Sequence, residues 1–155
     1  MTENQLLVHA TCISIDGHGV LLRGPPGSGK SSLALQLMES RGDGLSGSDM
    51  RAQLISDDQT LLTNRANALM ATAPANIQGF MEVRGYGLIS VKVLRTAPVL
   101  FAVDLMPWQD IDRMAEVGFE KISILAVDIY RMALDPSQPS APARLRLALR
   151  DFKEM

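Results

Sequence analysis

Apolar residues in this chain recur in short runs that predict strands. Apolar and β-branched side chains predominate at residues 6–15, and the pattern resumes at residues 20–23 after a turn that contains Gly17 and Gly19. Two such runs around a glycine turn predict a β-hairpin. Further strands are predicted at residues 53–56, 60–63, 68–72, 99–105 and 122–129, of which 60–63 and 68–72 form an antiparallel meander, and residues 81–93 are predicted as an extended stretch interrupted by glycines.

Three segments instead predict helices. Residues 30–41 carry several apolar side chains among good helix formers, and Gly42 ends the run. A short helix is predicted at residues 110–117. The last helix, at residues 143–153, follows a proline-rich connector at residues 135–142. Strands that alternate with helices, with antiparallel pairs near the front, predict a mixed α/β sheet.

Composition limits the class of protein. With 155 residues and 46% apolar side chains, the chain can bury one core, so we expect a single domain over residues 1–155. The charges nearly cancel, at 15 Lys and Arg against 17 Asp and Glu, which predicts no nucleic-acid binding. No apolar run approaches the roughly 20 residues of a membrane span and no cationic leader is present, so we expect a cytoplasmic protein without membrane contact. Cys12 is the lone cysteine, which fits a reducing compartment and a buried thiol, and Trp108 is expected in the core or in a subunit contact.

The segment from Gly24 to Ser31 carries the strongest chemical signal. Its sequence, GPPGSGKS, fits the phosphate-binding motif G-x-x-x-x-G-K-[ST] and lies between a predicted strand and a predicted helix. Glycines let backbone N–H groups converge on phosphate oxygens, Lys30 neutralises the β- and γ-phosphates, and the Ser31 hydroxyl ligates Mg²⁺. The alternative, a glycine turn that only joins two elements, leaves the match at every fixed position unexplained. We therefore predict an α/β P-loop nucleotide-binding fold with a mixed sheet.

Two adjacent acids complete the pattern. Asp57 and Asp58 follow the short apolar strand at residues 53–56, and a P-loop site needs a carboxylate near its metal. Neighbouring side chains on an extended segment point to opposite sides. One acid is therefore expected to meet the metal while the other acts on the substrate; an ordinary solvated turn is the alternative.

With these motifs the chain resembles the HPr kinase/phosphorylase family, whose members phosphorylate a serine of the phosphocarrier protein HPr and can remove the phosphate again. Members share a histidine at the front of a strand, a hairpin, a P-loop, a strand that ends in Asp-Asp, and a signature close to E-[IV]-R-G-x-G-[IL]-I. The matching positions here are His9, the P-loop, the two aspartates, and EVRGYGLI from Glu82 to Ile89. The resemblance covers about residues 8–93.

The resemblance implies an ATP-dependent protein-serine kinase with the fold of the family's C-terminal domain, which is related to phosphoenolpyruvate carboxykinase. It implies ATP and Mg²⁺ as cofactors, HPr of the phosphotransferase system as partner, and a homo-oligomer. The catalytic residues it implies are Asp57 as base on the serine hydroxyl, Lys30, His9 and Arg84. The nucleotide-binding residues are Gly24, Gly27, Ser28, Gly29, Lys30, Ser31 and Ser32. The implied metal ligands are Ser31, Asp58 and Glu82.

The chain departs from the family pattern in two places. Ser32 stands where members often have Glu, and residues 135–142 with a helix that carries Arg144, Arg146 and Arg150 replace an arginine- and glycine-containing loop. We therefore expect a short, single-domain form without the usual N-terminal domain, and retention of the reverse phosphorylase reaction stays open. The three arginines form either a basic face for an acidic partner or a solvated helix face. Two other functions also stay open: a P-loop kinase or NTPase with another substrate, and a nucleotide-binding regulator without catalysis.

Overall fold

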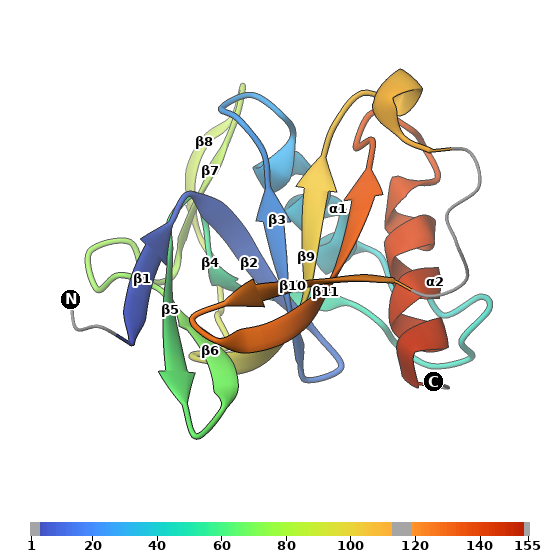
Figure 1. Cartoon of the computed structure of the whole chain (residues 1–155). Helices are drawn as coiled ribbons and strands as arrows, with labels where there is room; N and C mark the ends of the chain where they lie inside the picture. The colour runs from blue at the N-terminus through green and yellow to red at the C-terminus, as the bar shows by residue number, and fades with distance from the viewer. Residues whose placement is uncertain (1–3, 113–118, 154–155) are drawn as a thin grey trace.

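The structure of the protein, a computed structural model, describes residues 4–112 and 119–153 and shows an α/β fold (Figure 1). In chain order its elements are β1 (Gln5–Val8), β2 (Ala10–Ile15), β3 (His18–Arg23), α1 (Lys30–Glu39), β4 (Ala52–Ser56), β5 (Thr60–Arg65), β6 (Ala68–Thr72), β7 (Phe80–Val83), β8 (Gly87–Ser90), β9 (Ala97–Leu105), the 3₁₀ helix η1 (Trp108–Asp110), β10 (Glu120–Ile124), β11 (Val127–Leu134) and α2 (Ala141–Lys153). Within the described ranges, nine strands form one mixed sheet, and β7 and β8 form a separate ribbon.

Four strands of the large sheet end at the same edge. The main part of the sheet has the order β4-β2-β3-β9-β11-β10. Strand β9 is parallel to β3 and β11, and β2 is antiparallel to both β3 and β4, so β4, β3, β9 and β11 run in one direction. The arrows of β3, β9 and β11 point the same way in Figure 1. Ligands of open α/β sheets bind beyond the carboxyl ends of such strands, so this edge is the expected position of a site.

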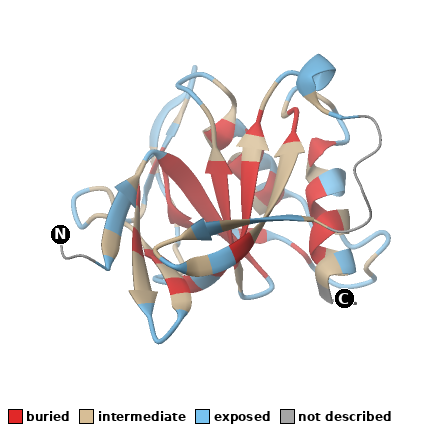
Figure 2. Ribbon diagram, viewed as in Figure 1, coloured by how far each residue is buried: buried red, intermediate tan, exposed pale blue. Residues whose placement is uncertain are grey.

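The two faces of the sheet bury separate apolar clusters because side chains alternate along each strand. Val20 and Leu22 of β3 pack with Leu33 and other residues of α1 and α2. Leu21 points to the opposite face and packs with Cys12 against the meander of β5 and β6. Figure 2 shows the buried residues concentrated along β2, β3, β9 and the inner sides of the helices. Burial raises the pKa of the Cys12 thiol to about 12, and the expected buried thiol is confirmed.

Most of the predicted elements are confirmed, including the meander and the strand–loop–helix order around the P-loop. The first hairpin is formed by β2 and β3, but the predicted run at residues 6–15 is broken at His9, and its first part, β1, pairs with β5. The prediction of one strand at residues 122–129 is wrong. β10 and β11 are two antiparallel strands joined at Leu125 and Ala126, whose φ angles are 50° and 62°. Glycine or asparagine usually occupies the positions of such a turn, and two apolar residues in their place gave no sign of it in the sequence.

Other boundaries also differ from the prediction. The stretch at residues 81–93 contains the β7–β8 hairpin, and α2 begins at Ala141, inside the predicted connector, because proline is tolerated in the first turn of a helix. Of the helix predicted at residues 110–117, Asp110 ends η1, residues 111–112 are not helical, and residues 113–117 lie outside the described residues. Among the helices of the described ranges, none is both long and apolar enough to cross a membrane.

Candidate active site

The carboxyl-end edge of the sheet brings together the segments that carry the predicted site. The P-loop, residues 24–31, leaves β3 and leads into α1, and Asp57 directly follows β4. Helix η1 follows β9, and Asp135 directly follows β11. The strand order places Asp57 on one side of the P-loop and the segments after β9 and β11 on the other.

The P-loop backbone curls as a phosphate cradle requires. Gly27 and Gly29 have φ angles of 80° and 101°, a region that glycine adopts without strain. The N–H of Ser28 donates to the Pro25 carbonyl at 3.0 Å. Gly24 packs so tightly that an added Cβ would lie 2.5 Å from the Ser28 hydroxyl. Helix α1 starts without a side-chain cap, so the N–H groups of its first turn are left for a ligand.

Lys30 carries a buried positive charge. Its side chain folds back onto the loop, where Nζ donates to the Gly24 carbonyl at 2.6 Å and to the Pro25 carbonyl at 3.2 Å. Lys30 is only 8% exposed, and no carboxylate of the described residues forms an ion pair with it. The hydroxyl of Ser28, in the same loop, is buried and finds no hydrogen-bond partner among the described residues. A buried ammonium group without a counter-charge is costly, and both groups fit a bound phosphate.

Asp57 is held by hydrogen bonds from three parts of the chain. Its Oδ1 accepts from the Ser31 hydroxyl at 2.7 Å and from the Thr11 hydroxyl at 2.9 Å, and its Oδ2 accepts from the Glu82 N–H at 3.3 Å. Asp57 is 7% exposed. The P-loop, β2 and β7 therefore fix one buried carboxylate beside the phosphate cradle.

The other two acids are more open. Asp58 is exposed with a φ of 66°, and its N–H donates to the Thr11 hydroxyl at 3.2 Å. Glu82 is an exposed residue of β7. Within the described residues, no three His, Cys, Asp or Glu side chains stand close enough to hold a metal ion. Because Mg²⁺ takes only one or two protein carboxylates together with water and substrate phosphates, this arrangement fits an ion that arrives with a nucleotide. The carboxylate beside Ser31 is Asp57 rather than the predicted ligand Asp58.

One pocket of about 400 Å³ joins these groups. It is lined by Pro26, Gly27, Gly29, Lys30, Ser31, Ser32, Leu35, Asp57, Asp58, Glu82, Val83 and Arg84. Ser32 is exposed on the first turn of α1, and Arg84 is exposed in the turn between β7 and β8. Of the predicted site residues, Gly24 and Ser28 lie within the loop itself, and the pocket collects all the rest except His9.

His9 lies apart from the pocket lining. It is exposed at the bend between β1 and β2. The next residue, Ala10, pairs with Arg23, so the backbone of His9 lies at the sheet edge beside the start of the P-loop. A role for His9 at the site stays a prediction.

A cluster of charged residues beside the P-loop was not predicted from the sequence. Arg23, the last residue before the loop, donates from Nε and an Nη to the two carboxylate oxygens of Asp104 at 2.7 and 3.0 Å, and Arg131 Nε donates to Asp104 at 2.6 Å. Burial alone would raise the pKa of Asp104, but the hydrogen bonds and charges of both arginines outweigh it and hold the pKa below its ordinary value. The cluster ties the ends of β3 and β9 to the middle of β11. Its members are far apart in the chain, so no local motif could signal it.

The three arginines of α2 have separate roles. Arg144 lies over the Trp108 ring, with its guanidinium carbon 4.7 Å from the centroid. Arg146 is only 8% exposed and donates to the Leu37 and Ser40 carbonyls at the end of α1, so it caps that helix. Arg150 pairs with its neighbour on α2. The buried Arg146 contradicts both a single basic face and a fully solvated helix face. Trp108 is 43% exposed, so it lies outside the core, and a subunit contact for this residue stays a prediction.

The fold and the pocket define the class of protein. A strand–loop–helix phosphate cradle with a buried lysine, next to a carboxylate fixed on a serine of the loop, is the arrangement of P-loop proteins that handle nucleotide phosphates. The sequence matches the family described as HPr Serine kinase C-terminal domain over residues 2–139, and the chain belongs to that family.

Individual proteins that are similar in sequence to this chain belong to the same family. The HPr kinase/phosphorylase of Chlorobium luteolum is 33% identical over 132 residues, which cover 78% of this chain and 37% of the relative. The HPr kinase/phosphorylase of Mycoplasma mycoides is 29% identical over 140 residues, which cover 83% of this chain and 42% of the relative. The chain thus spans well under half the length of these curated relatives.

A solved structure supports the fold directly. The Hpr(Ser) kinase/phosphatase from Coxiella burnetii superposes with a TM-score of 0.78 at 22% identity and covers 96% of each chain. The predicted α/β fold of the family's C-terminal domain is confirmed.

Proposed function

We propose that this protein is an ATP-dependent serine kinase whose substrate is HPr. The proposal is carried by one observation. A buried lysine that has no counter-charge among the described residues and a buried carboxylate fixed by three donors line the same pocket, Lys30 from the P-loop and Asp57 from the end of β4. Family membership supplies the substrate class, and the pocket supplies the chemistry.

In the proposed reaction the serine hydroxyl of HPr attacks the γ-phosphorus of ATP, the bond to the β–γ bridging oxygen breaks, and ADP leaves. Lys30 moves from the loop carbonyls to the β- and γ-phosphates and neutralises their charge. Asp57 accepts the hydroxyl proton. A carboxylate offers about four acceptor positions, and the three described donors to Asp57 leave one for the substrate. Such transfer depends mainly on positioning and charge stabilisation, which this fixed carboxylate and lysine supply.

The pocket also offers groups for Mg²⁺ and for the transferred phosphate. Ser31, Asp58 and Glu82 would hold Mg²⁺, which supplies further neutralisation of the phosphate oxygens. Arg84 stands exposed on the pocket wall formed by the β7–β8 turn, where a cation can meet the γ-phosphate or the phosphoserine product. His9, at the same sheet edge, is proposed to approach the phosphates from the β2 side.

The test is intact-mass analysis of purified HPr after incubation with the protein and Mg²⁺-ATP. We expect one added phosphate, located on serine by peptide fragmentation, and none with Lys30→Ala. Bound ATP without any added mass on HPr would refute the proposal and favour another substrate or a regulatory role.

Two matched substitutions separate the base from the metal ligand. Asp57→Asn keeps a hydrogen-bond acceptor for Ser31 and removes the base, so transfer should fall by roughly 10²- to 10⁴-fold while ATP affinity is retained. Asp58→Asn should instead raise the Mg²⁺ concentration needed for half-maximal rate. The opposite pattern would exchange the two roles. Incubating phosphorylated HPr with inorganic phosphate in the same assay tests the reverse reaction.

A further inference from the structure

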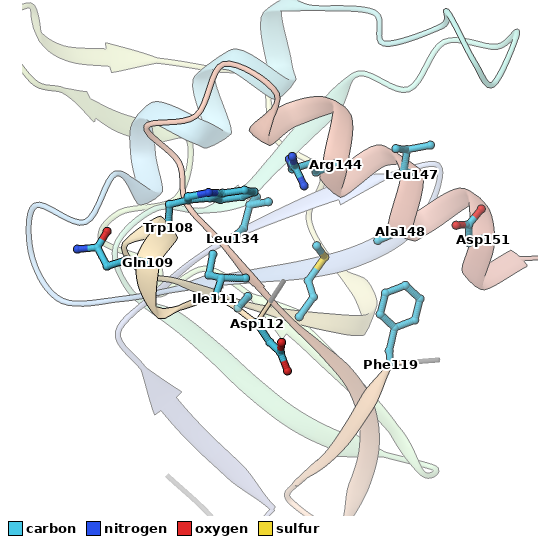
Figure 3. A pocket seen from close by; sticks show the side chains of 12 residues that line it. Trp108, Gln109, Ile111, Asp112, Phe119, Leu134, Arg144, Leu147, Ala148 and Asp151 are labelled. Carbon is cyan, nitrogen blue, oxygen red and sulfur yellow. The ribbon is translucent and has the colours of Figure 1, made fainter. Parts of the chain in front are cut away.

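A second, larger cavity opens on the opposite side of the P-loop from Asp57. It has a volume of about 860 Å³ and lies between η1, β11 and α2. Figure 3 shows Trp108 and Gln109 at one end and Phe119 and Asp151 at the other. Its floor is largely apolar, with Ile111, Met132, Leu134, Leu147 and Ala148 among the lining residues. Cavities of this size and character are typical small-molecule sites.

The cavity is connected to the P-loop through the segment that follows β11. Pro136 packs against the loop so closely that a Cβ added to Gly29 would lie 3.0 Å from its Cγ. Asp135, the preceding residue, accepts the Trp108 backbone N–H at 2.8 Å. Trp108 is thereby held next to the segment that touches the phosphate cradle.

The position of the acidic residues determines the direction in which a bound nucleotide runs. In phosphoryl transfer the attacking and leaving oxygens lie roughly in line on opposite sides of the phosphorus. Asp57 and Glu82 mark the attacking side, after β4 and on β7. The leaving diphosphate and its nucleoside must therefore extend the other way, toward the ends of β9 and β11, where the cavity lies.

The lining of the cavity suits an aromatic base better than a further phosphate. The Trp108 indole is 43% exposed, and the guanidinium of Arg144 lies over its ring, with the guanidinium carbon 4.7 Å from the centroid. Aromatic rings and guanidinium planes are the surfaces on which nucleobases stack. Among the described residues of the lining, the charged ones are Arg144, Asp112 and Asp151, which give no positive excess to attract an anion.

From these observations we propose that the cavity between η1 and α2 is the nucleoside subsite, in which the base of the nucleotide stacks on Trp108 while the phosphates lie on the P-loop. The inference rests on the proposed function and adds a site for the nucleoside, because the 400 Å³ pocket accounts only for the phosphates and the acceptor. Trp108 then determines how strongly the protein distinguishes a nucleotide from a bare polyphosphate.

The experiment uses the fact that Trp108 is the only tryptophan in the chain. Binding of Mg²⁺-ATP and of Mg²⁺-tripolyphosphate to the wild-type protein is measured by calorimetry and by tryptophan fluorescence. Both ligands should bind, and only ATP should change the Trp108 emission strongly. Trp108→Ala should weaken ATP binding about tenfold, which is about 1.4 kcal/mol, and leave tripolyphosphate binding unchanged. Trp108→Phe, which keeps an aromatic face, should restore most of the ATP affinity.

Each outcome decides between the two claims. Unchanged tripolyphosphate binding shows that Trp108→Ala keeps an intact P-loop, so an equal ATP affinity in the variant and the wild type would overturn the nucleoside subsite and leave the kinase proposal standing. ATP binding to the wild type with the same emission as tripolyphosphate would also overturn it. If the wild type bound neither ligand, the kinase proposal and this inference would fail together.

Discussion

Replacing Thr11 by valine should weaken the protein and its chemistry together, because this buried side chain positions Asp57. Thr11 is fully buried in β2, donates to Asp57 Oδ1 at 2.9 Å, and accepts from the Asp58 N–H at 3.2 Å. Valine has nearly the same shape and lacks only the hydroxyl. A hydrogen bond to a charged group contributes about 1.5–3 kcal/mol, and a neutral one about 0.5–1.5 kcal/mol. Asp58 is exposed, so water can replace the hydrogen bond that its N–H loses. We therefore expect the free energy of unfolding to fall by about 2–3 kcal/mol.

Thr60→Val is the matched control. Thr60 is equally buried, but its hydroxyl donates to the neutral Ala10 carbonyl at 2.9 Å and is not among the described donors to Asp57. The free energy of unfolding of Thr60→Val should be about 1 kcal/mol lower than that of the wild type. Urea unfolding followed by circular dichroism measures both values, and the melting temperature of Thr11→Val should fall by about 5–10 °C.

The kinetic result distinguishes positioning from stability alone. Thr11→Val should lower kcat for transfer to HPr about tenfold or more at an unchanged KM for ATP, because Asp57 loses one of the donors that orient it. Thr60→Val should keep the wild-type kcat. Equal losses of stability in the two variants, together with a normal kcat for Thr11→Val, would refute the positioning of Asp57 by Thr11.

Two further predictions concern the supports of the site. Gly42→Ala should destabilise the protein by about 1–3 kcal/mol in thermal unfolding, because Gly42 has a φ of 61° and an added Cβ would collide with the Arg146 guanidinium; Gly44→Ala, with open space around it, should stay within about 0.5 kcal/mol, and equal values would contradict the contact. Asp104→Asn should lower the free energy of unfolding by about 2 kcal/mol at pH 7, because it weakens the hydrogen bonds from Arg23 and Arg131. Because the folded pKa of Asp104 is lowered, its contribution is present above the unfolded value near 4 and is lost as the pH falls through the folded pKa. The difference in urea midpoint between wild type and Asp104→Asn should therefore shrink from pH 7 to pH 3, and a constant difference would contradict the ionic cluster.

Local patterns predicted the parts of this molecule whose chemistry lies in consecutive residues. The P-loop is one such part, because one turn of backbone supplies its glycines, its lysine and its helix start. The first hairpin is another, since two alternating runs flank a glycine turn. The turn at Leu125 and Ala126 was not predicted, because these two residues carry no local signal for the left-handed backbone that they adopt.

The sequence by itself determined the phosphate cradle, the acid pair and the order of strands and helices, because each depends on neighbours along the chain. Only the tertiary structure decided which groups meet. It placed Thr11, Ser31 and the Glu82 backbone around Asp57, and it joined Arg23 to Asp104 across 81 positions. It also turned Arg146 inward as a helix cap. Such contacts depend on strand order and register, which side-chain alternation along one strand cannot reveal, because the pleat determines the face of each residue but not the strand that lies beside it.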